Sequence, residues 1–205
     1  MSRRALLHLK KIDPILAEVI AEVGPCRFTP RTDGTHFDAV ARAIVFQQLS
    51  GRAASTILGR VHGVFGGRAP TPTELLAVAD EPLRAAGLSR QKIGYVRDLA
   101  ARVSSGEVAM ERLHELGDEE VIEALVRVKG VGVWTAQMFL IFRLGRMDVL
   151  PVADLGIKKG IQRAFRLPEL PSQSEVARIG ERWSPYATIA SWYLWRSLDG
   201  AFGAA

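Results

Sequence analysis

The stretch from Val128 to Gly160 reads VKGVGVWTAQMFLIFRLGRMDVLPVADLGIKKG. It contains a Gly-x-Gly turn, then apolar residues at helical spacing over residues 133–144, then Asp154. Upstream, residues 118–127 begin with Asp118 as an N-cap residue, followed by acidic side chains and a second helical pattern. The order predicts two helices joined by a tight hairpin, with a further helix beginning after the aspartate.

Gly130 and Gly132 give the predicted turn its character, because they remove side chains from the backbone. Bare N–H groups at the start of a helix, next to the positive end of its dipole, suit a phosphate oxygen. Many helical hairpins, however, use glycine only to turn the chain, and short motifs are weak indicators by themselves. From the turn alone, phosphate binding and a plain turn both stay open.

The longer pattern carries a family resemblance. Residues 128–134 run as a hydrophobic residue, lysine, Gly-Val-Gly, a variable residue and tryptophan, which resembles the hairpin of the helix-hairpin-helix (HhH-GPD) DNA glycosylases. Residues 150–154, Leu-Pro-Val-Ala-Asp, are similar to the segment that carries that family's aspartate. Residues 37–58 and 183–196 resemble its alkylated-base branch, the type II 3-methyladenine glycosylases. The resemblance therefore covers about residues 37–196, most of the chain.

The resemblance implies a mainly α, two-lobed helical fold with a central cleft. We expect one glycosylase domain over residues 1–205, with the hairpin at about 118–145 and the aspartate loop and helix at about 146–166. Some bacterial relatives carry an additional N-terminal β-rich domain, and we expect this chain to be too short to hold one.

Local signals elsewhere also favour helices. Asp13 followed by Pro14 predicts a helix start, and residues 71–74 and 172–175 have the sequence of capping boxes. The candidate strands are few and short, and they are residues 26–28 and 149–152.

By resemblance, Asp154 is the catalytic carboxylate of a glycosidic cleavage. Breaking a purine's C–N bond develops positive charge on the sugar, and a carboxylate beneath the sugar stabilises that oxocarbenium-like state. Its position just ahead of a helix should favour the ionised form and lower its pKa. Aspartate is also a preferred N-cap residue, so from its position alone Asp154 could be only a cap.

An enzyme that acts on a base within a duplex must take that base out of the stack and hold it in a pocket. Alkylated purines such as 3-methyladenine and 7-methylguanine are electron-poor, so an aromatic face attracts them by stacking and cation–π contact. Met138 stands where the family has a tyrosine, which alters the pocket's shape. We assign Trp183 and Trp192 to the core. The expected pocket residues, by resemblance, are Trp134, Trp195, Phe46, Met138 and Tyr193.

The wedge that fills the gap left by the flipped base corresponds, by resemblance, to Gln48, with Leu49 as the alternative. Gln48 could equally be only a cap at the end of a helix. Family members that also cut the strand carry a lysine nucleophile where this chain has Trp134. Because tryptophan cannot form a Schiff base, we expect a monofunctional enzyme without lyase activity.

Contacts to the DNA backbone are expected from the amides of Gly130, Gly132 and Trp134 and from the side chains of Lys158 and Lys159, although those lysines could also be a solvated helix face. Beyond them, Arg163 and Arg166 continue the basic run. The resemblance also implies a monovalent cation, Na⁺ or K⁺, on three main-chain carbonyls of the hairpin, and carbonyl oxygens suit a hard cation. These carbonyls belong to Val126, Val128 and Val131.

Composition limits the other classes of partner and cofactor. With Cys26 as its single cysteine, the chain cannot ligate the four-cysteine iron–sulfur cluster of some relatives, and we expect no required cofactor. The four histidines have no ligand spacing, so we assign none to a metal. A net charge of +5 favours an anionic partner. We expect a cytoplasmic monomer, nucleoid-associated if bacterial, that binds double-stranded DNA with alkylated bases and no membrane.

Two readings from other classes stay open. A non-catalytic DNA-binding module would keep the hairpin and use Asp154 only as a cap. A helical protein-interaction module would need neither the hairpin glycines nor the pocket tryptophans. The combination of glycine hairpin, aspartate and tryptophans favours the glycosylase, which would excise alkylated purines from duplex DNA by base flipping and leave an abasic site.

Overall fold

The computed structural model describes residues 3–198, and these residues form helices and connecting turns without a β-strand. The mainly α prediction is therefore confirmed. The candidate strands at residues 26–28 and 149–152 are wrong, because those residues form irregular connections and pair with no neighbouring strand. Their backbone groups bond elsewhere: the Val149 N–H donates to Thr188 Oγ1 at 3.0 Å.

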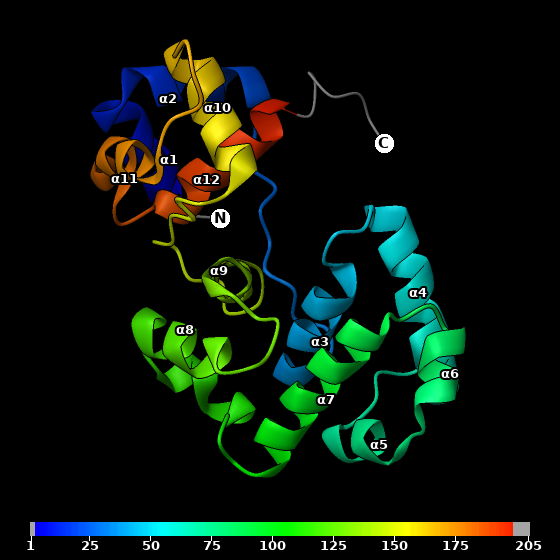
Figure 1. The fold of residues 1–205 in the computed structure, drawn as a ribbon. Coiled ribbons are helices and arrows are strands. Elements are labelled where there is room, and N and C mark those ends of the chain that lie inside the picture. Colours follow the sequence, from blue (N-terminus) through cyan, green and yellow to red (C-terminus); the bar gives the residue numbers. More distant parts are fainter. Residues whose placement is uncertain (1–2, 199–205) are drawn as a thin grey trace. The chain divides into compact units, whose positions relative to one another are not determined.

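The chain divides into two compact units, one of residues up to Arg31 and from Leu140 onward, the other of Thr32–Phe139. In the first unit, helices from both ends of the sequence gather in one bundle, with blue α1 and α2 beside yellow α10 and red α12 (Figure 1). Its helices are α1 (Arg3–Ile12), α2 (Pro14–Val23), α10 (Leu155–Phe165), α11 (Gln173–Gly180), the 3₁₀ turn η2 (Glu181–Trp183) and α12 (Ala187–Leu198).

A buried carboxylate ties the two ends of the chain together in this unit. Asp13 is the N-cap of α2, as predicted, and its Oδ1 accepts the N–H groups of Ile15 and Leu16. Its Oδ2 accepts the indole N–H of Trp183 at 2.9 Å. Trp183 is fully buried in the hydrophobic core, which confirms its assignment, and Trp192 packs against the same core. Every oxygen of the buried aspartate is thereby satisfied, as burial of a charge requires.

The second unit is built around α7 and contains the predicted hairpin. The α7 side chains of Ile93, Val96 and Leu99 are buried, so one face of this amphipathic helix lies in the unit's core. The predicted capping box at residues 71–74 is present at the start of α5, and the one at residues 172–175 starts α11. The helices are α3 (His36–Phe46), α4 (Gly51–Val64), α5 (Pro72–Ala77), α6 (Asp80–Ala85), α7 (Arg90–Ser104), the 3₁₀ turn η1 (Met110–Glu115), α8 (Asp118–Val126) and α9 (Val133–Phe142).

The boundary between the units falls within α9, since Phe139 belongs to one and Leu140 to the other. Among residues 3–198, no helix is long and apolar enough to span a membrane.

Candidate functional site

The predicted hairpin is formed by α8, a turn at residues 127–132 and α9. One detail of the prediction is wrong: Gly117, and not Asp118, is the N-cap residue of α8, and Asp118 is its first helical residue. The N–H of Gly117 is instead satisfied by the carboxylate of Glu120 at 2.8 Å. A glycine cap with an acid three residues later serves the helix start as well as an aspartate cap would.

Gly130 is required in the turn for two separate reasons. Its φ is +79°, in the left-handed region that side chains disfavour. In addition, the ring of Tyr95 on α7 packs so closely that a Cβ atom at Gly130 would lie 2.2 Å from Tyr95 Cδ2. The turn is therefore shaped by a contact from another helix as well as by its own sequence.

Gly132 faces open space, since a Cβ atom there would meet nothing within 4 Å. It directly precedes α9, whose first N–H groups have no intrahelical acceptors. The side chains of Val133 and Trp134 are 54% and 45% exposed, so the start of α9 is accessible. The open space around Gly132, the exposed side chains at the start of α9 and the positive end of the helix together form a surface that an anion can approach.

A cavity of about 630 Å³ lies beside the hairpin within the second unit. Three of the predicted pocket residues line it: Phe46 from α3, and Trp134 and Met138 from α9. Both predicted wedge residues, Gln48 and Leu49, line it from the turn between α3 and α4. Six lining residues were missed by the sequence analysis, and they are Ala43, Gln47, Gln91, Lys92, Tyr95 and Thr135. The full lining is Ala43, Phe46, Gln47, Gln48, Leu49, Gln91, Lys92, Tyr95, Gly130, Trp134, Thr135 and Met138.

Phe46 already has a cation on its ring, because the Arg42 guanidinium carbon lies 4.3 Å from the ring centroid. A ring that holds one cation on a face offers less attraction to a second cation. Within this cavity, Trp134 is therefore the stronger candidate for stacking on a charged ligand.

Gln48 and Leu49 are both exposed, in the turn between α3 and α4. Gln48 has φ +57°, a left-handed conformation that a non-glycine residue adopts at a cost. Such strain persists only where surrounding contacts impose the conformation, so the turn is held from outside.

Asp154 lies in the first unit as the N-cap of α10. Its Oδ1 accepts two hydrogen bonds at 2.8 Å, from the Ile157 N–H and from the indole Nε1–H of Trp195. A simple cap needs only the first of these bonds. The second is a bond from α12 to a carboxylate, and it fixes the orientation of the acid and stabilises negative charge on it.

Trp195 consequently has a different environment from the one predicted for a pocket aromatic. Its ring stacks on Phe142, with centroids 5.7 Å apart and an interplanar angle of 29°, while its N–H edge meets Asp154. Gly156 makes this approach possible, because a Cβ atom there would lie 2.7 Å from Trp195 Cδ1. The indole thus contacts Asp154 directly, which the sequence analysis did not foresee.

Tyr193 is a correction to the predicted pocket. Its side chain is fully buried in the hydrophobic core of the first unit, and its hydroxyl donates to the Gly24 carbonyl at 3.0 Å. Burial raises its pKa to about 12. Alternate residues of α12 point in different directions, so Trp195 reaches Asp154 while Tyr193 faces the core.

The basic run after Asp154 separates into two roles. Lys158 and Lys159 are partly exposed on α10 and stay candidates for phosphate contact. Arg163 bonds the Glu22 carboxylate at 2.6 Å and also donates to the Ser197 carbonyl, so it ties α10 to α2 and α12. Arg166 ends α10 in a left-handed conformation with φ +53°.

The three carbonyls named for a cation suit such an ion chemically. Val126 ends α8, so its carbonyl lies in the last turn, where helical carbonyls lack intrahelical donors. The Val128 carbonyl accepts the Val131 N–H at 3.0 Å and retains a second lone pair. Neutral oxygens of this kind fit a hard monovalent cation better than a transition metal.

Two of the residues that the sequence analysis missed, Lys92 and Gln47, act through contacts that are distant in sequence. Lys92 donates to the carbonyls of Val45 and Gln47, and Gln47 donates to the Gly130 carbonyl. No periodicity or motif marks these positions. The sequence offered one signal for Lys92, which is a lysine close to the apolar face of a predicted helix. Because lysine is seldom buried without partners, such a position indicates a binding partner for its ammonium group.

Comparisons with known proteins agree on one family. Residues 41–185 match the family described as HhH-GPD superfamily base excision DNA repair protein. The chain is 35% identical over 197 residues to DNA-3-methyladenine glycosylase 1 of Schizosaccharomyces pombe, across 95% of this chain and 86% of that protein. The structure of the Schizosaccharomyces pombe 3-methyladenine DNA glycosylase in complex with abasic DNA is similar with a TM-score of 0.87, at 34% identity over 98% of this chain and 100% of that one. DNA-3-methyladenine glycosidase from Bacillus halodurans is similar with a TM-score of 0.85, at 37% identity over 97% and 90% of the two chains.

Proposed function

Because the chain belongs to the HhH-GPD superfamily of base excision DNA repair proteins, we propose that it is a monofunctional DNA glycosylase that releases alkylated purines from duplex DNA. The product is an abasic site in an unbroken strand. The observation that carries this proposal is the Asp154 carboxylate, held through Oδ1 by both the α10 backbone and the Trp195 indole.

Asp154 acts on the sugar as the base departs. Positive charge develops on the deoxyribose ring as the C–N bond breaks, and a fixed carboxylate stabilises it without reorganisation. The Trp195 N–H fixes the orientation of the carboxylate, since a hydrogen bond to a charged group is about twice as strong as a neutral one. Water then attacks the sugar, because Trp134 offers no amine for a Schiff base.

The flipped base is recognised by three of the side chains that line the cavity beside the hairpin. Trp134, with Phe46 and Met138, supplies the stacking surface, which favours electron-poor purines such as 3-methyladenine and 7-methylguanine. The strained and exposed turn at Gln48 and Leu49 supplies the wedge that replaces the extruded base.

The hairpin binds the DNA backbone. The N–H groups at the start of α9 contact a phosphate, and Lys158 and Lys159 contribute positive charge from α10. A monovalent cation on the carbonyls of Val126, Val128 and Val131 would complete the hairpin's electrostatic surface. The enzyme works as a cytoplasmic monomer with no other cofactor.

The alternative, a DNA-binding module in which Asp154 only caps α10, leaves one contact unexplained. The Ile157 N–H would suffice for a cap, whereas the bond from Trp195 requires a tryptophan on α12 and a glycine at position 156. The Trp195 bond adds nothing to capping but orients the Asp154 carboxylate, and it therefore supports a catalytic role for Asp154.

The test is release of methylated bases from methylated duplex DNA by the wild-type protein and by Asp154→Asn. Asparagine keeps a cap oxygen but loses the charge, so excision should fall about 100-fold or more while affinity for abasic-site duplex stays within several-fold. Chromatography identifies the released bases, and gel electrophoresis before and after alkali shows whether the strand is intact.

Asp33→Asn serves as the matched control, because it removes the same charge from an exposed loop residue and should leave excision unchanged. Near wild-type excision by Asp154→Asn would leave the aspartate as a cap only, and no base release by the wild-type protein would refute the glycosylase assignment.

A further inference from the structure

Lys92 places its charged side chain against main-chain carbonyls. Its side chain is partly buried on α7, and its ammonium donates to the carbonyls of Val45 and Gln47, each at 2.7 Å. Burial lowers the pKa of Lys92, so holding the charged form there costs free energy. Both acceptors lie at the carboxyl end of α3, where the helix dipole and the unpaired carbonyls offset that cost. The lysine therefore fixes the end of α3 and the beginning of the next turn.

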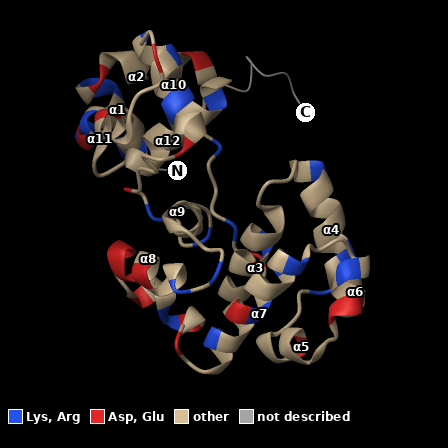
Figure 2. Cartoon of the chain, in the orientation of Figure 1, with Lys and Arg blue, Asp and Glu red and all other residues tan. Residues whose placement is uncertain are grey.

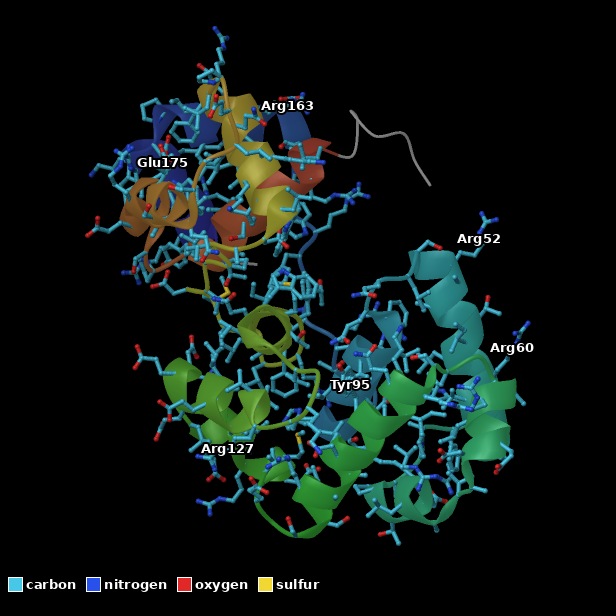
Figure 3. The ribbon with its side chains drawn as sticks, in the orientation of Figure 1. Arg52, Arg60, Tyr95, Arg127, Arg163 and Glu175 are labelled. Carbon is cyan, nitrogen blue, oxygen red and sulfur yellow. The ribbon has the colours of Figure 1, made fainter. Side chains whose placement is uncertain are left out.

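Gln47 extends the connection to the hairpin. Its Nε2 donates to the Gly130 carbonyl at 2.8 Å, across 83 residues of sequence. Gly130 is in turn covered by the Tyr95 ring, and the Tyr95 hydroxyl accepts a bond from Gln91 at 2.7 Å. Figure 3 labels Tyr95 on α7, the same helix that carries Lys92 one turn earlier. One face of α7 thus holds both the turn after α3 and the turn of the hairpin.

The strained residue lies directly beside this connection. Gln48 has φ +57° and follows Gln47, whose carbonyl and side chain are both bound. Without those bonds, the turn would relax toward conformations with negative φ, because the left-handed one is costly for glutamine. The bonds to Lys92 and Gly130 are what keep Gln48 and Leu49 in their exposed conformation.

We propose that Lys92 and Gln47 are positioning residues that hold the wedge turn in a fixed register with the phosphate-binding hairpin. Once the hairpin binds the DNA backbone, the wedge is already placed at a set distance along the strand, so little ordering is needed to insert it. The inference rests on the proposed function, from which the wedge and hairpin take their roles.

The first experiment compares Lys92→Met and Gln47→Leu with the wild-type protein in single-turnover release of 7-methylguanine. One substrate is a fully paired duplex, and in the other the damaged base faces an abasic-site analogue, so that no pair has to be broken and no partner base meets the wedge. Each variant should be about 10- to 100-fold slower on the paired duplex and within about threefold of wild type on the unpaired one. Rates are corrected for the active fraction, so a partly unfolded sample does not mimic the effect.

A double-mutant cycle supplies the second readout. Because both residues hold the same turn, the Lys92→Met/Gln47→Leu variant should be no slower on the paired duplex than the slower single variant. Lys10→Met, which removes the same charge from an exposed position on α1, should match the wild-type protein on both substrates. Equal losses on both substrates, or additive losses in the double variant, would overturn the proposal and leave Lys92 and Gln47 as contributors to stability only.

A third readout separates this inference from the proposed function. A 2-aminopurine placed opposite an abasic-site analogue reports insertion of the wedge by its change in fluorescence on protein binding, without any excision. Lys92→Met and Gln47→Leu should reduce that change while leaving affinity for undamaged duplex within about twofold. If the wild-type protein released no base, the proposed function would fail. The 2-aminopurine fluorescence change would still decide whether Lys92 positions the turn. A fluorescence change in the variants equal to that of the wild-type protein would refute the positioning role alone.

Discussion

At the scale of single residues, Asp154 combines two functions that are usually alternatives. It caps α10 through the Ile157 N–H and accepts the Trp195 indole with the same oxygen. A capping aspartate is already rigid, because its side chain is bound to the helix it starts. An aspartate held as a cap is therefore an oriented carboxylate, because the helix contact already restricts its side chain.

Trp195→Phe separates the indole N–H from the aromatic face. The variant keeps a ring that can stack on Phe142 but loses the bond to Asp154, so excision should slow by about 10- to 100-fold, the loss expected for a hydrogen bond to a charged group. Because the effect acts through the carboxylate, it should be similar for charged 7-methylguanine and neutral hypoxanthine. Single-turnover rates on the two substrates measure it.

Trp192→Phe is the matched control, since Trp192 packs at the edge of the core and bonds no catalytic group. A loss confined to 7-methylguanine would instead identify Trp195 as the cation-binding face that its sequence position first suggested.

At the scale of elements, the hairpin between α8 and α9 uses its two glycines differently. Gly130 is a structural requirement, given its φ of +79° and the Tyr95 ring against it. Gly132 has free space around it, so its lack of a side chain leaves the start of α9 open to an approaching group. One residue shapes the turn, and the other keeps it accessible.

Alanine substitution should distinguish these roles. Gly130→Ala should lower the free energy of unfolding by more than about 1 kcal/mol, because alanine disfavours positive φ and would collide with Tyr95. Gly132→Ala should leave stability nearly unchanged but weaken binding to undamaged duplex by about fivefold or more, since a methyl group would obstruct the phosphate. Chemical denaturation and fluorescence anisotropy measure the two quantities. Unaltered duplex affinity in Gly132→Ala would remove the start of α9 from the DNA contact.

At the scale of the whole chain, charge is distributed unevenly around the hairpin helices. The first turn of α8 carries Asp118, Glu119 and Glu120, which appear red in Figure 2, while the opposite end of that helix carries the glycine turn. The acids stabilise the helix start and repel phosphate, so the end with the turn is the more favourable end of α8 for a phosphate group. Arg52 and Arg60 point outward from α4 (Figure 3) and add to the net charge of +5.

Binding to undamaged duplex should therefore be weak, strongly dependent on salt and indifferent to sequence. Backbone amides and basic side chains meet phosphates, so the logarithm of the binding constant should fall linearly with the logarithm of salt concentration. Anisotropy titrations on several unrelated duplexes across a salt series provide the measurement. A binding constant that varied with sequence, or that did not respond to salt, would show that base edges contribute to recognition.

Features that depend on neighbours along the chain follow from the sequence alone. Helix starts at Asp13, Thr71 and Ser172, the hairpin around Gly130, and the cap position of Asp154 all follow from propensity, capping and periodicity, which act over a few residues. The family resemblance adds the prediction that Asp154 is the catalytic carboxylate. Short apolar runs were less certain, and residues 149–152 were mistaken for a strand because nothing local distinguishes an extended connection from one.

Contacts between side chains that are far apart in the sequence depend on how the helices pack. The bond from Trp195 to Asp154 spans 41 residues, and the bond from Gln47 to Gly130 spans 83. It was also packing, and not helical spacing, that sent Tyr193 into the core and brought Lys92 to the end of α3. A helical pattern in the sequence indicates which residues share one face of a helix. It does not indicate which other helix that face contacts, because this depends on how the helices pack.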